Sequence, residues 1–233
     1  MADARHKELG LTDEDVLEMF KTMLLARKLD ERMWLLNRAG KIPFVISCQG
    51  QEAAQVGAAF ALDRDNDYTA PYYRDLGVVL AFGMTAKDLM LSAFAKAEDP
   101  NSGGRQMPSH FGQKKNRILT GSSPVTTQLP HAVGVALAAK MDQKNIASFV
   151  TLGEGSSNQG DFHEGLNFAG VHKLPVITMV ENNKYAISVP IQKQLACEKV
   201  SDRAQGYGMP GITVDGNDPL LYLKSLKRQE NGL

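Results

Sequence analysis

Two short polar segments carry the side chains with the clearest chemical potential. Glu154 stands in a Gly-Glu-Gly turn, and Asn182 and Asn183 follow a second apolar run further along the chain. A carboxylate and an amide oxygen are hard ligands of the kind that Mg²⁺ prefers, usually together with a phosphate-bearing ligand. Two serines follow the glycine turn near a helix start, where backbone N–H groups can bind an anion. These residues therefore indicate a magnesium ion that bridges a diphosphate.

The elements around these segments explain how they could meet. The runs Ile146–Leu152 and Val176–Val180 are typical of β-strands, and the stretch Gln159–His172 between them is typical of a helix. This β-loop-α-β pattern predicts parallel strands whose carboxyl ends share one edge of a sheet, where α/β proteins bind ligands. Adjacent asparagines point in opposite directions in an extended segment, so only one of Asn182 and Asn183 can ligate the metal.

The first half of the chain predicts helices. A capping box in Thr12–Asp15 opens one helix that stops near Gly40, and a second helix begins near Gln51 with many small residues. A third helix is expected from Thr85 to about Lys96. A Gly-, Ser- and Pro-rich loop from Asp99 to Pro130 follows, and then a helix over 131–141. The fold class expected is α/β.

Composition excludes several classes of function. The 233 residues carry 26 basic and 26 acidic side chains, so no basic surplus supports binding to nucleic acid. No apolar run approaches the roughly 18 residues of a membrane span, and the polar start does not resemble a signal peptide. Two distant cysteines, Cys48 and Cys197, form no disulfide framework, which favours the cytoplasm. We therefore expect neither nucleic acid nor membrane as a partner.

The glycine turn lacks the G-x-G-x-x-G of a dinucleotide site and the G-K-[ST] of a P-loop. These absences discourage a nucleotide-binding module of some other kind, which stays an alternative that calorimetry with ATP would test.

A family resemblance covers nearly the whole chain, from about Gly10 to Pro219. The segment GEGSSNQGDFHEGLNFAGVHKLPVITMVENNKYAIS resembles the thiamine-diphosphate motif. Together with PYYRDLG, GGRQMPSHFG, TGSSPVTTQ and GYGMPGITVDGND, it resembles the α subunits of 2-oxo acid dehydrogenase decarboxylating components, above all the branched-chain type. The resemblance implies a thiamine-diphosphate-binding fold, with a mainly parallel sheet flanked by helices. Its expected domains are a helical region over 1–40, a cofactor-binding domain over 41–219 and an atypical, truncated tail over 220–233.

The resemblance also implies roles for matching residues. The magnesium ligands would be Glu154, Asn183 and the Tyr185 carbonyl. The cofactor would further contact Tyr73, Arg74, Ser123, Val125, Gly153, Gly155, Ser156 and Ile187. A potassium ion would be held by Ser122, Pro124, Thr127 and Gln128, and the substrate pocket would include Phe44, Tyr72 and Ser123.

Two further residues near these motifs, His110 and Glu181, are considered for whether they face the cofactor site. Among the histidines, only His110 stands in a loop that could face the site. The sequence assigns no catalytic residue in this chain, and His110 is the one candidate. Glu181 stands where some relatives carry a phosphate-binding arginine, so we expect its side chain to face away from the diphosphate.

The implied activity is oxidative decarboxylation of branched-chain 2-oxo acids, such as 3-methyl-2-oxobutanoate, with transfer of the acyl group to a lipoyl domain. The implied partners are a β subunit, in a heterotetramer of two α and two β subunits, and a lipoyl acyltransferase. Pyruvate or acetoin as substrate stays an alternative, because an apolar pocket discriminates weakly between acyl groups. A non-catalytic, truncated subunit that binds its β partner is another, since the chain departs from the family after Pro219 and ends in LLYLKSLKRQENGL.

Overall fold

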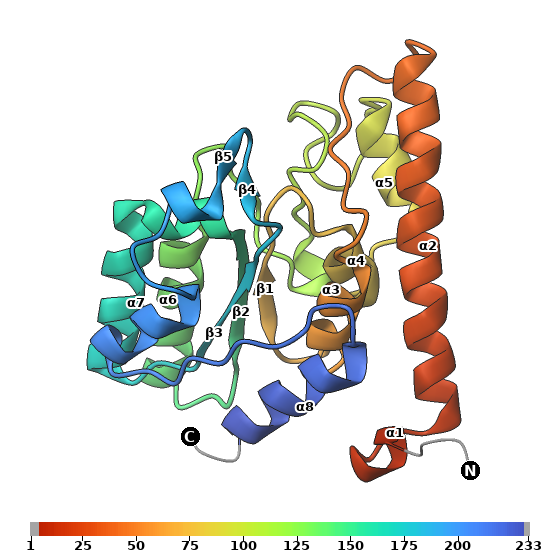
Figure 1. Cartoon of the computed structure of the whole chain (residues 1–233). Coiled ribbons are helices and arrows are strands. Elements are labelled where there is room, and N and C mark those ends of the chain that lie inside the picture. Colours follow the sequence, from red (N-terminus) through yellow and green to blue (C-terminus); the bar gives the residue numbers. More distant parts are fainter. Residues whose placement is uncertain (1–4, 231–233) are drawn as a thin grey trace. The chain divides into compact units, whose positions relative to one another are not determined.

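The computed structural model of the chain describes residues 5–230, which form two compact units (Figure 1). One unit combines the described parts of three segments, up to residue 63, 73–109 and from 214 onward. The other combines residues 64–72 and 110–213. The outermost residues of the expected segments 1–40 and 220–233 lie outside the described residues. The expected boundaries at residues 40 and 219 stay predictions, because the compact units follow spatial contacts and cut across them.

The first unit is helical within the described residues. Its two clearest helix starts are the capping boxes that the sequence predicts. Thr12 and Asp15 exchange side-chain and backbone hydrogen bonds at one, and Thr85 and Asp88 do so at the other. The helices are α1 (Arg5–Glu8), α2 (Asp13–Arg38), α3 (Glu52–Ala59), α4 (Leu76–Ala81), α5 (Ala86–Ala93) and α8 (Pro219–Glu230).

Helix α3 is the centre of this unit and packs against α2, α4 and α8. It is rich in alanine, and Ala54, Ala58 and Ala59 are buried, so neighbouring helices can approach closely. The predicted third helix ends at Ala93 rather than near Lys96. The short helix α4 was not predicted.

The second unit contains a parallel sheet in the order β1-β2-β3, built from β1 (Tyr68–Ala70), β2 (Ser148–Gly153) and β3 (Val176–Glu181). The helix α7 (Gly160–His172) connects β2 to β3, as the β-loop-α-β pattern predicts. The expected α/β class, with a parallel sheet flanked by helices and a helical N-terminal region, is confirmed.

Helix α6 (Gln128–Met141) lies along the sheet and α7 packs against α6, as Figure 1 shows. Leu129 and Ala136 of α6 are buried against Val150 and Leu152 of β2, whose side chains are fully covered. On the outer helix, Leu166 joins the same core. This apolar core holds the carboxyl ends of the strands in place.

Several short elements of the second unit follow no clear sequence pattern. They are the antiparallel hairpin of β4 (Tyr185–Ala186) and β5 (Val189–Pro190), and four 3₁₀ turns. The turns are η1 (Lys114–Asn116), η2 (Glu154–Asn158), η3 (Ile191–Lys193) and η4 (Val200–Tyr207). The long loop expected from Asp99 is otherwise irregular, and α6 begins at Gln128, three residues before the helix that the sequence predicts.

Cys48, which is buried, and Cys197, which is partly covered, form no disulfide within residues 5–230. Among the helices of residues 5–230, none combines the length and the apolar character needed to cross a membrane.

Candidate cation and diphosphate site

The carboxyl ends of β2 and β3 lie side by side, as the parallel topology requires. Gly153, the last residue of β2, is the register partner of Glu181, the last residue of β3. Glu154 therefore follows one strand end, and Asn182 follows the other. Neighbouring strands are about 4.8 Å apart, so the two polar segments leave the sheet as neighbours.

A close backbone approach joins the two segments again further out. A Cβ atom added to Gly155 would lie 2.7 Å from the Cβ of Ala186, which is closer than real Cβ atoms come. Only glycine therefore allows the η2 turn to pack against the β4 strand, which begins two residues after Asn183. The need for glycine at this turn has a steric cause.

The Glu154 carboxylate is the most unusual group of the site. The residue is only 2% exposed, and its side chain makes one hydrogen bond, in which Gln194 Nε2 donates to Oε1 at 3.3 Å. Within the described residues no Lys, Arg or His forms an ion pair with it. Burying a carboxylate with one hydrogen bond and no positively charged partner lowers the stability of the fold by several kcal/mol. The position therefore favours a cation beside Glu154.

The two asparagines form successive turns that present their amides at the strand end. Asn182 Oδ1 accepts a hydrogen bond from Lys184 N at 2.8 Å, and Asn183 Oδ1 accepts one from Tyr185 N at 2.9 Å. Each amide oxygen has two lone pairs, so Asn183 keeps one for a cation. Lys184, which follows Asn183, adopts a left-handed backbone with φ of 70°.

The tip of the β4–β5 hairpin is apolar and strained. Ile187 is fully exposed and has a φ of 56°, which is an outlier for a β-branched residue. Tyr185 is also more than half exposed. Strain of this kind clusters at ligand sites, which supports the expected contact between Ile187 and a cofactor.

The donor set fits a hard divalent cation. Within residues 5–230, His, Cys, Asp and Glu side chains form no group of three that could hold a metal ion. A cation at Glu154 would therefore be bound by one carboxylate together with amide and carbonyl oxygens, which suits Mg²⁺ better than zinc. Gln194 Oε1, which faces the turn, is buried and has no hydrogen-bond partner in the described chain. This orphaned acceptor is a second sign that the turn is built for a ligand.

Three side chains brace the η2 turn: Ser157 from within it, and Thr126 and Arg203 from other segments. Thr126 is buried, has a φ of 77°, and its Oγ1 donates to the Ser156 carbonyl at 2.9 Å. Ser157 Oγ donates to the Glu154 carbonyl at 2.6 Å. Arg203 Nη1 donates to the Ser157 carbonyl, and Nη2 donates to Asn158 Oδ1 at 2.8 Å. The backbone beside Gly155 and Ser156 is thus held rigidly.

The loop expected to bind potassium and the cofactor rings, residues 122–128, includes Thr126 and so contacts the η2 turn. His110 Nε2 and Ser123 Oγ lie 2.6 Å apart and share a hydrogen bond. Val125 is 49% exposed and so is available for contact with a ligand. Gln128 Nε2 donates to the Thr151 carbonyl of β2 at 3.0 Å. The potassium ligands Ser122, Pro124, Thr127 and Gln128 stay a prediction.

Tyr72 links all three strands of the sheet. It follows β1, its N–H donates to Thr151 Oγ1 on β2 at 3.2 Å, and its hydroxyl donates to Glu181 Oε2 on β3 at 3.2 Å. Glu181 is buried, at 4% exposure, and does not point into solvent. Its expected orientation away from the diphosphate stays a prediction, as does the contact of Tyr72 with the substrate.

Phe44, Tyr73 and Arg74 belong to the helical unit. The Arg74 guanidinium lies 5.3 Å from the Tyr73 ring centre, and its Nη1 donates to the Ser47 carbonyl at 2.7 Å. Gln55 Nε2 holds the Arg74 carbonyl at 2.9 Å. The expected contact of Tyr73 and Arg74 with a cofactor stays a prediction.

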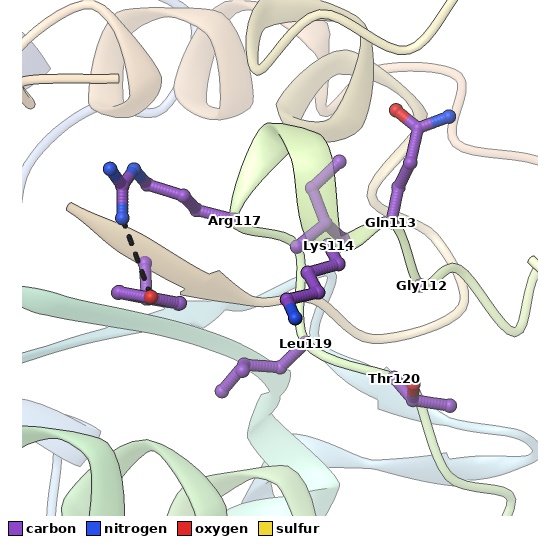
Figure 2. Close-up of a pocket in the computed structure, with 8 residues that line it drawn as sticks. Gly112, Gln113, Lys114, Arg117, Leu119 and Thr120 are labelled. Atoms are coloured by element: carbon purple, nitrogen blue, oxygen red, sulfur yellow. Dashed lines mark hydrogen bonds between the residues drawn. The ribbon is translucent and has the colours of Figure 1, made fainter. Parts of the chain in front are cut away.

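A cavity of about 240 Å³ lies elsewhere in the sheet unit (Figure 2). Its walls include Lys114 and Leu119, and Arg117 Nη1 donates to Tyr68 Oη at 3.3 Å beside it. Tyr68 pairs with Ser148, at the opposite end of β2 from Glu154. The cavity shares no residue with the expected cofactor site.

Comparison with known proteins places the chain in a family. Residues 20–229 match the family model described as "Dehydrogenase E1 component". The chain is 78% identical, over 97% of its length, to the "2-oxoisovalerate dehydrogenase subunit alpha" of Bacillus subtilis, and it spans 69% of that protein. It is 40% identical over 90% of its length to the mitochondrial counterpart of Dictyostelium discoideum, and 38% identical over 93% to that of Homo sapiens.

The chain spans about half the length of these two mitochondrial relatives, 47% and 48%. The solved structure of a putative thiamin diphosphate-dependent enzyme from Mycobacterium smegmatis is similar with a TM-score of 0.48 and 21% identity, over 76% of this chain and 28% of that one. The family model alone matches far more than half of the residues. The chain belongs to the dehydrogenase E1 component family.

Proposed function

We propose that this chain is the α subunit of a thiamine-diphosphate-dependent 2-oxo acid dehydrogenase component that acts on branched-chain 2-oxo acids, such as 3-methyl-2-oxobutanoate. It works with a β subunit, in a heterotetramer of two α and two β subunits, and passes the acyl group to a lipoyl acyltransferase. The identity of 78% to the Bacillus subtilis 2-oxoisovalerate dehydrogenase subunit supports this substrate class. A cytoplasmic location is part of the same proposal.

One structural observation carries the cofactor assignment. The Glu154 carboxylate is buried with a single long hydrogen bond and no cationic partner in the described chain, at a strand end where Asn183 follows the neighbouring strand. Such a group is stabilised by a divalent cation, and Mg²⁺ commonly keeps phosphate oxygens in its shell. The site therefore suits the magnesium complex of a diphosphate.

Each region of the site then has a defined task. Glu154, Asn183 and the Tyr185 carbonyl bind Mg²⁺. Gly153, Gly155 and Ser156 approach the diphosphate, and Tyr73 and Arg74 are further diphosphate contacts in this proposal. Bound thiamine diphosphate supplies the electron sink that lets a 2-oxo acid lose carbon dioxide. Residues of this chain orient the cofactor and substrate and exclude water. Ser123, Val125 and Ile187 contact the cofactor rings, and Phe44 and Tyr72 contact the acyl group of the substrate. The segment 122–128 binds a potassium ion.

The test compares substrates in the assembled complex. The chain is mixed with its β subunit, thiamine diphosphate and Mg²⁺, and release of carbon dioxide is measured with 3-methyl-2-oxobutanoate and with pyruvate. Higher kcat/KM for the branched acid supports the proposal. Equal or higher kcat/KM for pyruvate would contradict the substrate class while leaving the cofactor assignment in place.

A second outcome concerns catalysis itself. If the complex binds thiamine diphosphate with Mg²⁺ but releases no carbon dioxide from either acid, the chain is a non-catalytic subunit that binds its β partner. If calorimetry shows binding of ATP and none of thiamine diphosphate, the whole proposal fails.

A further inference from the structure

Gln194 lies where three parts of the cation site meet, although no sequence motif includes it. It ends the 3₁₀ turn η3, and its backbone N–H donates to the Ile191 carbonyl at 2.9 Å. Ile191 N in turn donates to the carbonyl of Lys184 at 2.9 Å. The turn that carries Gln194 is therefore anchored to the residue that directly follows Asn183.

The Gln194 side chain reaches from this turn to the other strand end. Its Nε2 donates to the Val189 carbonyl at 2.7 Å and to Glu154 Oε1 at 3.3 Å. Both partners are pure acceptors, so the amide group must be oriented with its nitrogen, and not Oε1, against them. The side chain thus connects the β4–β5 hairpin to the carboxylate at the start of η2.

The remaining polar atom of Gln194 is left unsatisfied by this arrangement. Oε1 is buried without a hydrogen-bond partner in the described chain, and it lies 3.5 Å from the position that a Cβ of residue 155 would occupy. Burying an acceptor without a partner is unfavourable, and native structures contain few such atoms. The orientation of Gln194 is therefore set by what its nitrogen holds.

We propose that Gln194 is a positioning residue for the cation site, and this inference rests on the function proposed above. Its Nε2 holds Oε1 of Glu154, while Oε2 makes no hydrogen bond within the described residues and is left for the metal ion. The same nitrogen fixes the hairpin whose first strand follows Asn183, so both ligands keep their spacing. Groups that orient a metal ligand in this way typically change metal affinity by about 10- to 100-fold when they are removed.

The test measures cation binding directly, with Mn²⁺ as the probe. The chain is assembled with its β subunit and saturated with thiamine diphosphate, and free Mn²⁺ is followed by electron paramagnetic resonance. Two variants are compared, Gln194→Ala and Gln194→Met. Methionine matches the length of glutamine but donates no hydrogen bond, so it separates hydrogen bonding from packing.

Gln192→Ala is the matched control, because Gln192 lies on the same turn and is exposed. We expect both Gln194 variants to raise the Kd for Mn²⁺ about 10- to 100-fold, and the control to stay within about twofold of the unmodified chain. Circular dichroism of each variant checks that it is folded.

Three results would count against the inference in different ways. Mn²⁺ binding by Gln194→Met within about twofold of the unmodified chain would overturn it and leave the proposed function intact. Equal weakening by Gln192→Ala would also overturn it, because the effect would then belong to the turn as a whole. Absence of Mn²⁺ binding in the unmodified complex would overturn the proposed function, and this inference with it.

Discussion

Replacing Glu154 by glutamine should move stability and ligand binding in opposite directions. The substitution keeps the size of the side chain and removes its charge. The residue that carries this charge is 2% exposed, and its carboxylate has one hydrogen bond, at 3.3 Å, within residues 5–230. We therefore expect Glu154→Gln to stabilise the ligand-free protein and to weaken binding of Mg²⁺ with thiamine diphosphate.

The magnitudes follow from the burial of the group. An incompletely satisfied buried polar group costs about 1–3 kcal/mol, and more when it is charged. For a chain of this size, each kcal/mol shifts Tm by about 2–4 °C, so Tm of the ligand-free variant should rise by about 2–12 °C. Removal of a direct ligand should lower cation affinity by more than about 100-fold, beyond the effect of an orienting residue.

The assay is thermal unfolding with and without Mg²⁺ and thiamine diphosphate. The unmodified protein should gain about 2.7 kcal/mol at ligand concentrations 100 times Kd, and Glu154→Gln should gain almost nothing. The control is Glu164→Gln, on the exposed surface of α7, which should change stability by less than about 0.5 kcal/mol. The reasoning is refuted if Glu154→Gln lowers Tm without ligand and keeps the full shift with it.

Three other predictions test separate parts of the structure. Gly155→Ala should cost about 1–3 kcal/mol of unfolding free energy through its clash with the hairpin, whereas Gly134→Ala, with open space around its Cβ position in α6, should gain about 0.5–1 kcal/mol by chemical denaturation; a destabilised Gly134→Ala or a neutral Gly155→Ala would contradict this. Tyr72→Phe and Glu181→Gln should show a coupling of about 1–2 kcal/mol in a double-mutant cycle, and additive effects would show that their hydrogen bond is not formed. Burial raises the pKa of Asp99, but hydrogen bonds from Asn101, Gly104 and Ser102 outweigh burial and hold this pKa below its usual 3.8. The Asp99 carboxylate therefore stabilises the fold fully above the pKa of the unfolded chain, and this stabilisation is lost as pH falls through the pKa of the folded chain. The rise of unfolding free energy with pH just below 3.8 should accordingly be smaller in Asp99→Asn than in the unmodified protein.

Local signals predicted local structure well. The capping boxes at Thr12 and Thr85 depend on residues three positions apart, and both helices begin where these patterns indicate. The adjacency of Glu154 and Asn182 was also predictable, because parallel strands joined by one helix bring their carboxyl ends to the same edge. Type and spacing were sufficient in these cases.

Contacts between distant segments were not predictable in the same way. Strand β1 has only three residues, and Tyr72 meets Thr151 and Glu181 across 79 and 109 positions of sequence. Gln194 meets Glu154 across 40 positions, from a segment with no strong pattern. Such partners depend on the tertiary fold, so the sequence showed the expected ligands but not the residues that hold them.

The sheet unit draws β1 from residues 64–72 and its other strands from residues 110–213. No contiguous stretch of the gene that omits residues 73–109 can encode it. A fragment that started at residue 110 would lack β1, so one edge of β2 would have unpaired backbone groups. Such an edge favours association with the same edge of another copy. Anyone wishing to isolate this half of the protein would have to splice residue 72 to residue 110, or supply the first strand in trans.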